Sequence, residues 1–366
     1  MLTPVESLLH SCWFKLICGA SYQDLPAVRN LALAYALAGA DCIDMAADPA
    51  VVSAAKEGLA IAKRLAESAD GQWQRPGYRS PLVMVSMSAG EDPHFRKAWF
   101  DANICPTDCS RPCEKICPAA AIAFEPKESG VISDRCYGCG RCLPVCPYGL
   151  IEAKSQPTSL DAIAQEVLTQ ADALEIHTHV GQQHAFANLW RAIKPWTEHL
   201  QLISISCPDG ENLISYLKEL QQIIGADPNS ASENSDTKTI LIWQTDGRPM
   251  SGDIGRGTTH AAIRLAQKVL AAELSGYVQP AGGTNQYTVT KLRALGLLPS
   301  LDTNLVATHT VSGIAYGSFA RRLLMSVLEQ NHYLEEVPHA LQTAVTLAES
   351  LVTPLKQVAI GRSQAQ

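Results

Sequence analysis

The stretch CYGCGRCLPVCP, from Cys136 to Pro147, decides how the middle of this chain folds. Its spacing, C-x2-C-x2-C-x3-C-P, is typical of ferredoxins. In those proteins three thiolates from one tight loop bind a [4Fe-4S] cluster, and the fourth cysteine binds a neighbouring cluster. The spacing therefore predicts iron-sulfur chemistry in this segment.

A second run of cysteines precedes this stretch, and its gaps are wider. Three residues separate each cysteine from the next, and a proline follows the last one, in the order Cys105, Cys109, Cys113, Cys117 and Pro118. If the two runs exchange their last ligands, cluster 1 is bound by Cys105, Cys109, Cys113 and Cys146, and cluster 2 by Cys136, Cys139, Cys142 and Cys117. The wider gaps leave a [4Fe-4S] or a [3Fe-4S] cluster open for cluster 1. We expect two iron-sulfur clusters, at least one of them [4Fe-4S].

Zinc is the main alternative, because CxxC pairs also bind zinc. Zinc sites rarely use eight cysteines with two Cys-Pro endings, so the iron-sulfur interpretation is favoured. Disulfides are disfavoured, because the chain shows no signal peptide and its remaining cysteines are scattered. We interpret these four as small buried residues, namely Cys12, Cys18, Cys42 and Cys207.

Composition narrows the class of protein. With 366 residues the chain is too long for a ferredoxin alone, so most of it forms something else. The net charge of -7 and the lack of a basic stripe disfavour nucleic-acid binding. No apolar run approaches the roughly 20 residues that span a bilayer. We therefore expect a cytoplasmic protein in a reducing compartment.

Outside the cysteine segment, short apolar runs alternate with helical patterns. The runs predict eight strands, at residues 14–19, 41–46, 82–87, 174–179, 202–207, 240–245, 277–280 and 305–309. The patterns predict eight helices, at residues 25–37, 50–65, 159–169, 184–199, 212–224, 258–270, 288–295 and 313–328. This alternation predicts an α/β fold, a (β/α)8-like barrel, better than an open doubly wound sheet.

The cysteine segment interrupts this pattern after the third strand. We predict a discontinuous barrel from residues 1–100 and 155–334, a ferredoxin-like insert at 101–154, and a C-terminal helix and tail at 335–366. The insert replaces one of the loops at the C-terminal end of the strands, where the active sites of such barrels lie. We therefore expect the clusters above the barrel mouth.

One face of the predicted strands is consistently polar and should line the barrel. It carries Lys15, Asp44, Glu175 and His177, and it also carries Ser86, Ser88, His179, Ser204, Ser206, Gln244, Asp246 and Gln279. Buried ionisable groups must neutralise one another or meet a ligand, so a salt-bridged interior and a small-molecule site both stay open. A metal site at His177 and His179 is a weaker alternative, because no third ligand is apparent.

Two glycine-bearing segments add a candidate anion site. Gly282 and Gly283 follow the seventh predicted strand, and Ser312 and Gly313 follow the eighth and would open a helix. In many barrels this pair of loops binds phosphate through free backbone N–H groups.

The chain as a whole resembles the light-dependent period (LdpA) family of cyanobacteria. The resemblance rests on both cysteine runs together with FKLICGAS at 14–21, DCIDMA at 41–46 and QPAGGTN at 279–285. It implies an iron-sulfur protein that relays cellular redox state to the circadian clock, with clock input proteins as partners.

Two functions from different classes remain in view. The favoured one is a redox sensor, which binds and signals without turnover. The alternative is a ferredoxin-linked oxidoreductase acting on a small anionic substrate or flavin in the barrel mouth, where the four charged residues would move protons.

Overall fold

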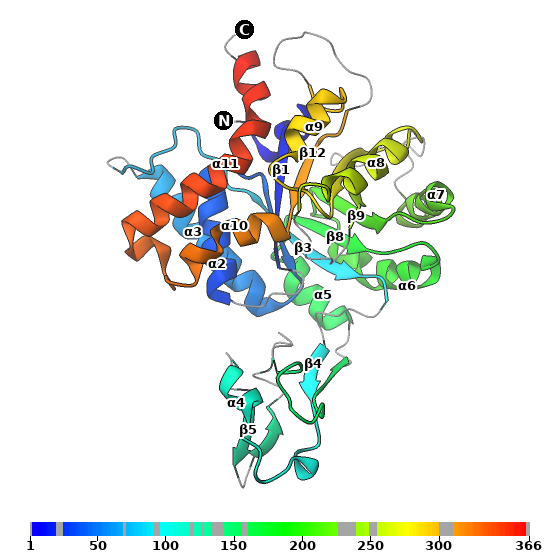
Figure 1. Ribbon diagram of the computed structural model, residues 1–366. Coiled ribbons are helices and arrows are strands. Elements are labelled where there is room, and N and C mark those ends of the chain that lie inside the picture. The colour runs from blue at the N-terminus through cyan, green and yellow to red at the C-terminus, as the bar shows by residue number, and fades with distance from the viewer. Residues whose placement is uncertain are drawn as a thin grey trace. The chain divides into compact units, whose positions relative to one another are not determined.

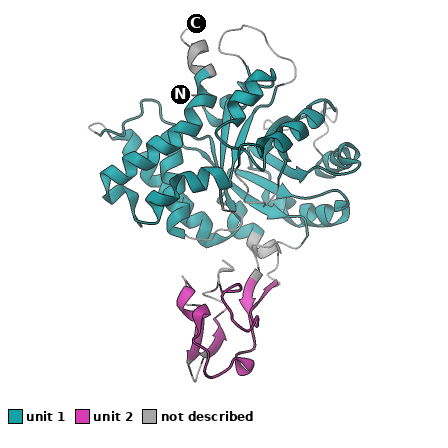
Figure 2. Ribbon diagram, in the orientation of Figure 1, with its two compact units in different colours: residues 1–19, 25–90, 160–366 teal, residues 20–24, 91–159 magenta. Residues whose placement is uncertain are grey.

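The computed structural model (Figure 1) describes residues 2–19, 25–68, 71–90, 96–117, 121–125, 128–132, 136, 142–155, 160–225, 239–248, 255–299 and 310–363. The chain divides into two compact units (Figure 2). The larger comprises residues 1–19, 25–90 and 160–366, and the smaller comprises 20–24 and 91–159.

The larger unit is built on one sheet of eight parallel strands. They are β1 (Trp13–Gly19), β2 (Cys42–Ala46), β3 (Leu82–Ser88), β8 (Ala173–His177), β9 (Leu202–Pro208), β10 (Ile240–Asp246), β11 (Tyr277–Ala281) and β12 (Gly313–Tyr316). Their order in the sheet is β11-β10-β9-β8-β3-β2-β1-β12. The two edge strands meet, because Ser312 N–H donates to Val278 O at 2.9 Å. The predicted barrel is therefore confirmed.

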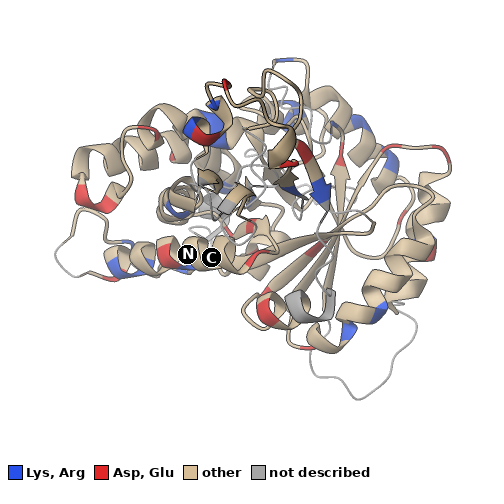
Figure 3. Cartoon of the chain, turned by 90° about the horizontal axis from the view of Figure 1, so that it is seen from below, with Lys and Arg blue, Asp and Glu red and all other residues tan. Residues whose placement is uncertain are grey.

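Helices surround this sheet (Figure 1). They are α1 (Pro4–Leu9), α2 (Leu25–Ala38), α3 (Pro49–Glu67), α5 (Leu160–Leu168), α6 (Gln183–Ile193), α7 (Leu213–Ile224), α8 (Thr259–Leu270), α9 (Thr288–Ala294), α10 (Ser318–Leu328) and α11 (Pro338–Ser363), with short 3-10 turns at Lys194–Trp196 and Leu334–Glu336. Acidic and basic residues are interspersed over the helices of this unit (Figure 3).

The eighth strand differs from its prediction. The expected segment, 305–309, lies outside the described residues, and the eighth strand is β12, where we expected the start of a helix. Gly313 pairs with Trp13, and a Cβ on this glycine would lie 2.0 Å from the Trp13 carbonyl oxygen. The glycine therefore allows close strand packing at this point and does not form a helix-opening turn.

The N-terminal end of the barrel is closed by apolar side chains. One buried cluster holds inward-facing residues near the N-terminal ends of several strands and a side chain from α1, namely Leu8, Trp13, Cys42, Leu82, Met84, Ala173, Leu202 and Ile242. Helix α1 begins with a capping box in which Thr3 N–H donates to Glu6 and Glu6 N–H donates to Thr3 Oγ1. This helix places Leu8 against the barrel floor.

Helix α11 is fixed to the same end by a partly buried ion pair. Lys356 Nζ donates to both oxygens of Asp41, at 2.6 and 2.5 Å, and to Ser7 Oγ at 2.9 Å. Asp41 Oδ2 also accepts the Phe14 N–H at 2.7 Å. One carboxylate thus links α1, β1 and α11.

The smaller unit lies between β3 and α5 in the sequence. Its ends pair as antiparallel strands β4 (Arg96–Trp99) and β7 (Glu152–Ser155). Between them lie the 3-10 turn Ala102–Ile104, helix α4 (Pro112–Ile116), and the hairpin β5 (Ile122–Glu125) and β6 (Glu128–Val131). Across the described residues of both units, no helix is long and apolar enough to span a membrane.

Candidate iron-sulfur site and barrel interior

Seven of the eight predicted cysteine ligands lie in the described part of the smaller unit, and Cys139 lies outside it. Cys113 and Cys142 are 5% and 6% exposed and belong to the core of the unit, together with Ala98, Phe100, Ile122 and Ile151. Four more cysteines are half-buried and pack against this core, namely Cys105, Cys117, Cys136 and Cys146. The thiols are therefore part of the packing of the unit.

Four of these thiols lie close together. Cys105 interacts with Cys109 and Cys146, and Cys113 interacts with Cys105 and Cys146. Burial, followed by the neighbouring thiols, raises the pKa of Cys105. These four residues are the ones that the crossed ligand pattern assigns to cluster 1. Their assignment as ligands stays a prediction.

Backbone N–H groups face several of the sulfurs. Arg111 N–H donates to Cys109 Sγ at 3.4 Å, Ala121 N–H to Cys117 Sγ at 3.2 Å, and Leu150 N–H to Cys146 Sγ at 3.4 Å. Although burial acts in the opposite direction, backbone N–H groups of residues 148–151 lower the pKa of Cys146. Such hydrogen bonds favour the thiolate, the form that binds metal, and they tune iron-sulfur clusters. The donor set fits an iron-sulfur cluster.

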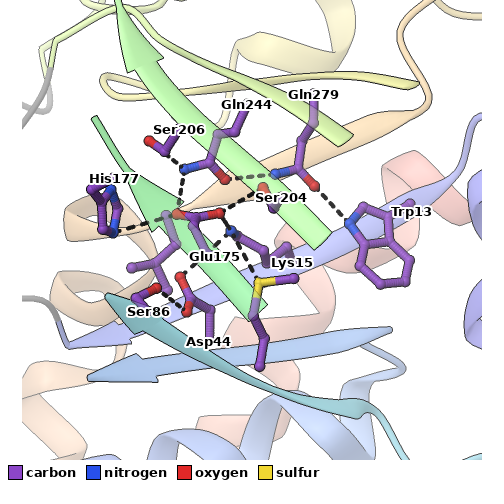
Figure 4. Close-up of polar contacts among 12 residues, drawn as sticks. Trp13, Lys15, Asp44, Ser86, Glu175, His177, Ser204, Ser206, Gln244 and Gln279 are labelled. Atoms are coloured by element: carbon purple, nitrogen blue, oxygen red, sulfur yellow. Dashed lines mark hydrogen bonds and ion pairs between the residues drawn. The ribbon is translucent and has the colours of Figure 1, made fainter. Parts of the chain in front are cut away.

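Inside the barrel, Lys15 lies at the centre of a buried charge network (Figure 4). Its ammonium pairs with Glu175 Oε2, lies 3.5 Å from Asp44 Oδ2, and is 3.5 Å from Met84 Sδ. The side chains of the three charged residues are at most 1% exposed. His177 Nε2 lies 3.5 Å from Glu175 Oε1. The His177 side chain is 28% exposed, so it connects the buried network to solvent.

Hydrogen bonds from neighbouring strands hold the carboxylates in place. Glu175 accepts from Ser204 Oγ and from Gln244 Nε2, both at 2.8 Å. Gln279 Nε2 donates to Gln244 Oε1 at 2.7 Å, and Trp13 Nε1 donates to Gln279 Oε1 at 2.6 Å. These hydrogen bonds form a continuous chain of inward-facing polar groups, which runs past the contact between β11 and β12 and holds each side chain in place.

The electrostatics of the interior follow from burial and from Lys15. Burial lowers the pKa of Lys15, but the nearby carboxylates of Asp44 and Glu175 raise it by more. The net pKa is therefore raised, and the lysine stays charged. The pKa of Glu175 is lowered because Lys15 outweighs burial, whereas burial dominates at Asp44 and raises its pKa. At the end of β10, burial raises the pKa of Asp246 to about 6.

The four residues predicted to line the barrel, Lys15, Asp44, Glu175 and His177, are thus brought together. Their role in binding or catalysis stays a prediction. His179 lies beyond the end of β8 and is exposed, and among the described residues no three His, Cys, Asp or Glu side chains form a metal-ion site.

The network also contains partners that the sequence patterns did not single out, Trp13 and Met84. Both lie on the inward face at an even spacing from predicted residues, Trp13 two residues before Lys15 and Met84 two before Ser86. Strand alternation was therefore the signal that could have found them.

The predicted anion site is not assembled. Gly282 and Gly283 follow β11 at its C-terminal end, after Ala281. Ser312 lies beside Val278, near the start of the same strand, and Gly313 begins β12. The two glycine-bearing segments therefore lie at opposite ends of the barrel, because the eighth strand comes later in the sequence than predicted.

Comparison with known proteins shows which family the chain resembles along its whole length. The profile of the LdpA Fe-S cluster-binding domain matches residues 105–157, and that of the light dependent period A C-terminal domain matches residues 167–354. The protein "Light dependent period A" from Synechococcus elongatus is 51% identical over 367 residues, which cover 99% of this chain and 96% of that protein.

More distant similarities fall on single parts of the chain or on the fold. The electron transport protein HydN from Escherichia coli K12 is 36% identical over 56 residues, 15% of this chain and 32% of that protein. Tryptophan synthase subunit alpha from Legionella pneumophila aligns with 98% of this chain and 100% of its own at 11% identity and a TM-score of 0.41. The identity and coverage of the Synechococcus protein are decisive: the chain belongs to the light dependent period A family and contains its iron-sulfur cluster-binding domain.

Proposed function

We propose that this protein is a redox sensor, in which the smaller unit responds to the oxidation state of two iron-sulfur clusters and partner proteins of the circadian clock input pathway read the response. Family membership supports an iron-sulfur protein of the light-dependent period pathway. A reducing cytoplasm is the proposed setting, because the predicted ligands must remain thiolates.

The observation that carries this proposal is the position of the cysteines in the core of the smaller unit. Cys113 and Cys142 pack among Phe100, Ile122 and Ile151. A unit this small buries little apolar surface, so its fold depends on ligation of its thiolates. Any change at the ligands therefore reaches the packing of the unit directly.

Arg111 provides a route from a thiolate to the rest of the unit. A bound cluster supplies one-electron redox chemistry and changes the charge that its ligands carry. The Arg111 N–H donates to Cys109 Sγ, while its guanidinium lies 4.2 Å over the ring of Phe124 on β5. Its backbone has a φ of +51°, an uncommon conformation for this residue type. A change of charge at Cys109 would thus shift the β5–β6 hairpin through Arg111.

Hydrogen exchange measured on oxidised and reduced protein, purified without oxygen, tests this proposal. We expect exchange to change in residues 96–155 on reduction and to stay constant in the barrel strands. Cys109→Ser should lose the change around the hairpin, and Cys207→Ser, a buried cysteine on β9, should retain it. Equal exchange in both oxidation states would reject redox sensing by this unit.

A further inference from the structure

The eight barrel strands are unevenly charged. They carry one lysine against three carboxylates, Lys15 against Asp44, Glu175 and Asp246, with His177 as the one other basic side chain. All lie on the inward face, where excess negative charge is costly unless a proton or a cation offsets it. This charge balance favours a cationic ligand over the anionic one that the sequence suggested.

The inward-facing side chains also change in size from one end of the barrel to the other. The N-terminal end is filled with bulky side chains such as Trp13 and Leu82. By strand alternation, the last inward-facing residues of β2, β3, β10 and β11 are small or polar, namely Ala46, Ser88, Asp246 and Ala281. A packed barrel is usually filled by bulky branched residues in every layer. The C-terminal end therefore departs from simple core packing.

One carboxylate oxygen at this end, Asp246 Oδ1, is buried and has no hydrogen-bond donor among the described residues. The Asp246 carboxylate packs over Gly282, which has a φ of +62°, and a Cβ on that glycine would lie 1.7 Å from Oδ1. A glycine is thus required to leave Asp246 in position. Buried acceptors without donors are uncommon and mark a place where a donor is expected.

We propose that the C-terminal end of the barrel binds a small molecule bearing a protonated amine, whose N–H groups donate hydrogen bonds to Asp246. This site is separate from the iron-sulfur function proposed above. Burial raises the pKa of Asp246, so a proton competes with the amine for this carboxylate as the pH falls.

Calorimetric titration of the cluster-loaded protein tests this site. Methylammonium, ethanolamine and 1,4-diaminobutane serve as amine probes, with ethylene glycol as the uncharged control and inorganic phosphate as the anion. We expect at least one amine to bind at pH 7 and to bind about tenfold more weakly at pH 5, where Asp246 is largely protonated. The titratable groups facing Asp246 are His177 and Glu175 on β8, Lys15 on β1 and Cys207 on β9.

Four variants separate the contributions. Asp246→Asn should abolish binding, and Ser88→Leu should abolish it by filling the site without changing its charge. His177→Gln should bind and keep the pH dependence, which assigns that dependence to Asp246. Glu336→Gln, at an exposed carboxylate elsewhere, should match the parent protein. Binding of phosphate in place of the amines, no binding of any amine, or amine binding unaffected by Asp246→Asn and Ser88→Leu would each overturn the proposal.

Discussion

At the scale of single residues, the barrel interior depends on Lys15. This buried ammonium offsets two carboxylates that no other lysine or arginine of the barrel strands reaches. Removing it would leave Glu175 and Asp44 charged or force them to take up protons. Breaking a buried pair by deleting one partner typically costs about 3–5 kcal/mol.

We therefore expect Lys15→Ala to lower the free energy of unfolding by about 3–5 kcal/mol in urea denaturation. The matched control is Lys268→Ala. Lys268 pairs with Asp209 at 2.6 Å, but 43% and 61% of the two side chains are exposed. Such a pair contributes less than about 1 kcal/mol. Similar losses in the two variants would show that the interior network is not stabilising.

The raised pKa of Asp246 predicts how the stability of the protein changes with pH. Its pKa is raised from 3.8 to about 6, so the folded protein holds a proton that the unfolded chain releases. Stability from this group is therefore complete below pH 4 and is lost as pH rises through 6, a loss on the order of 3 kcal/mol. Asp246→Asn removes this loss.

In urea denaturation at pH 7 we expect Asp246→Asn to raise the free energy of unfolding, by as much as about 3 kcal/mol, and at pH 5 by about 1 kcal/mol less. A variant that is less stable than the parent at pH 7 would contradict the assigned direction of the pKa.

At the scale of elements, α11 is part of the barrel's packing. The helix contributes buried residues such as Leu341, Val345 and Val352, each at most 1% exposed, and it contacts α2 and α10. Leu341→Ala should therefore lower the free energy of unfolding by about 2–5 kcal/mol. Gln342→Ala, on the exposed face of the same turn, should change it by less than about 0.5 kcal/mol. Equal effects would mean that α11 does not pack as described.

The elements also show which parts of the fold the sequence could predict. Apolar strands such as β3 and β9 are clear because parallel strands are buried on both faces. Strand β12 was missed because Gly313 looks like a turn residue, and only its contact with Trp13, 300 residues away in sequence, explains the glycine. The predicted anion site failed for the same reason.

At the scale of the whole molecule, the cysteine spacing and the polar strand faces were visible in the sequence. Regular ligand gaps reflect the geometry of a cluster, and alternation reflects the pleat of a strand, so both are local signals. The interaction of Trp13 with Gln279 and the packing of Asp246 on Gly282 depend on barrel closure, which no local pattern records. Contacts between residues far apart in sequence could therefore be identified only from the structure.

The proposed redox sensor requires that thiolates of the smaller unit bind two iron-sulfur clusters. Iron and sulfide analysis with EPR spectroscopy tests this on protein purified without oxygen, for the parent chain and for Cys109→Ala and Cys139→Ala. We predict about seven to eight iron atoms per chain and loss of a different cluster signal in each variant. A colourless, iron-poor protein, or variants that lose neither signal, would contradict the account.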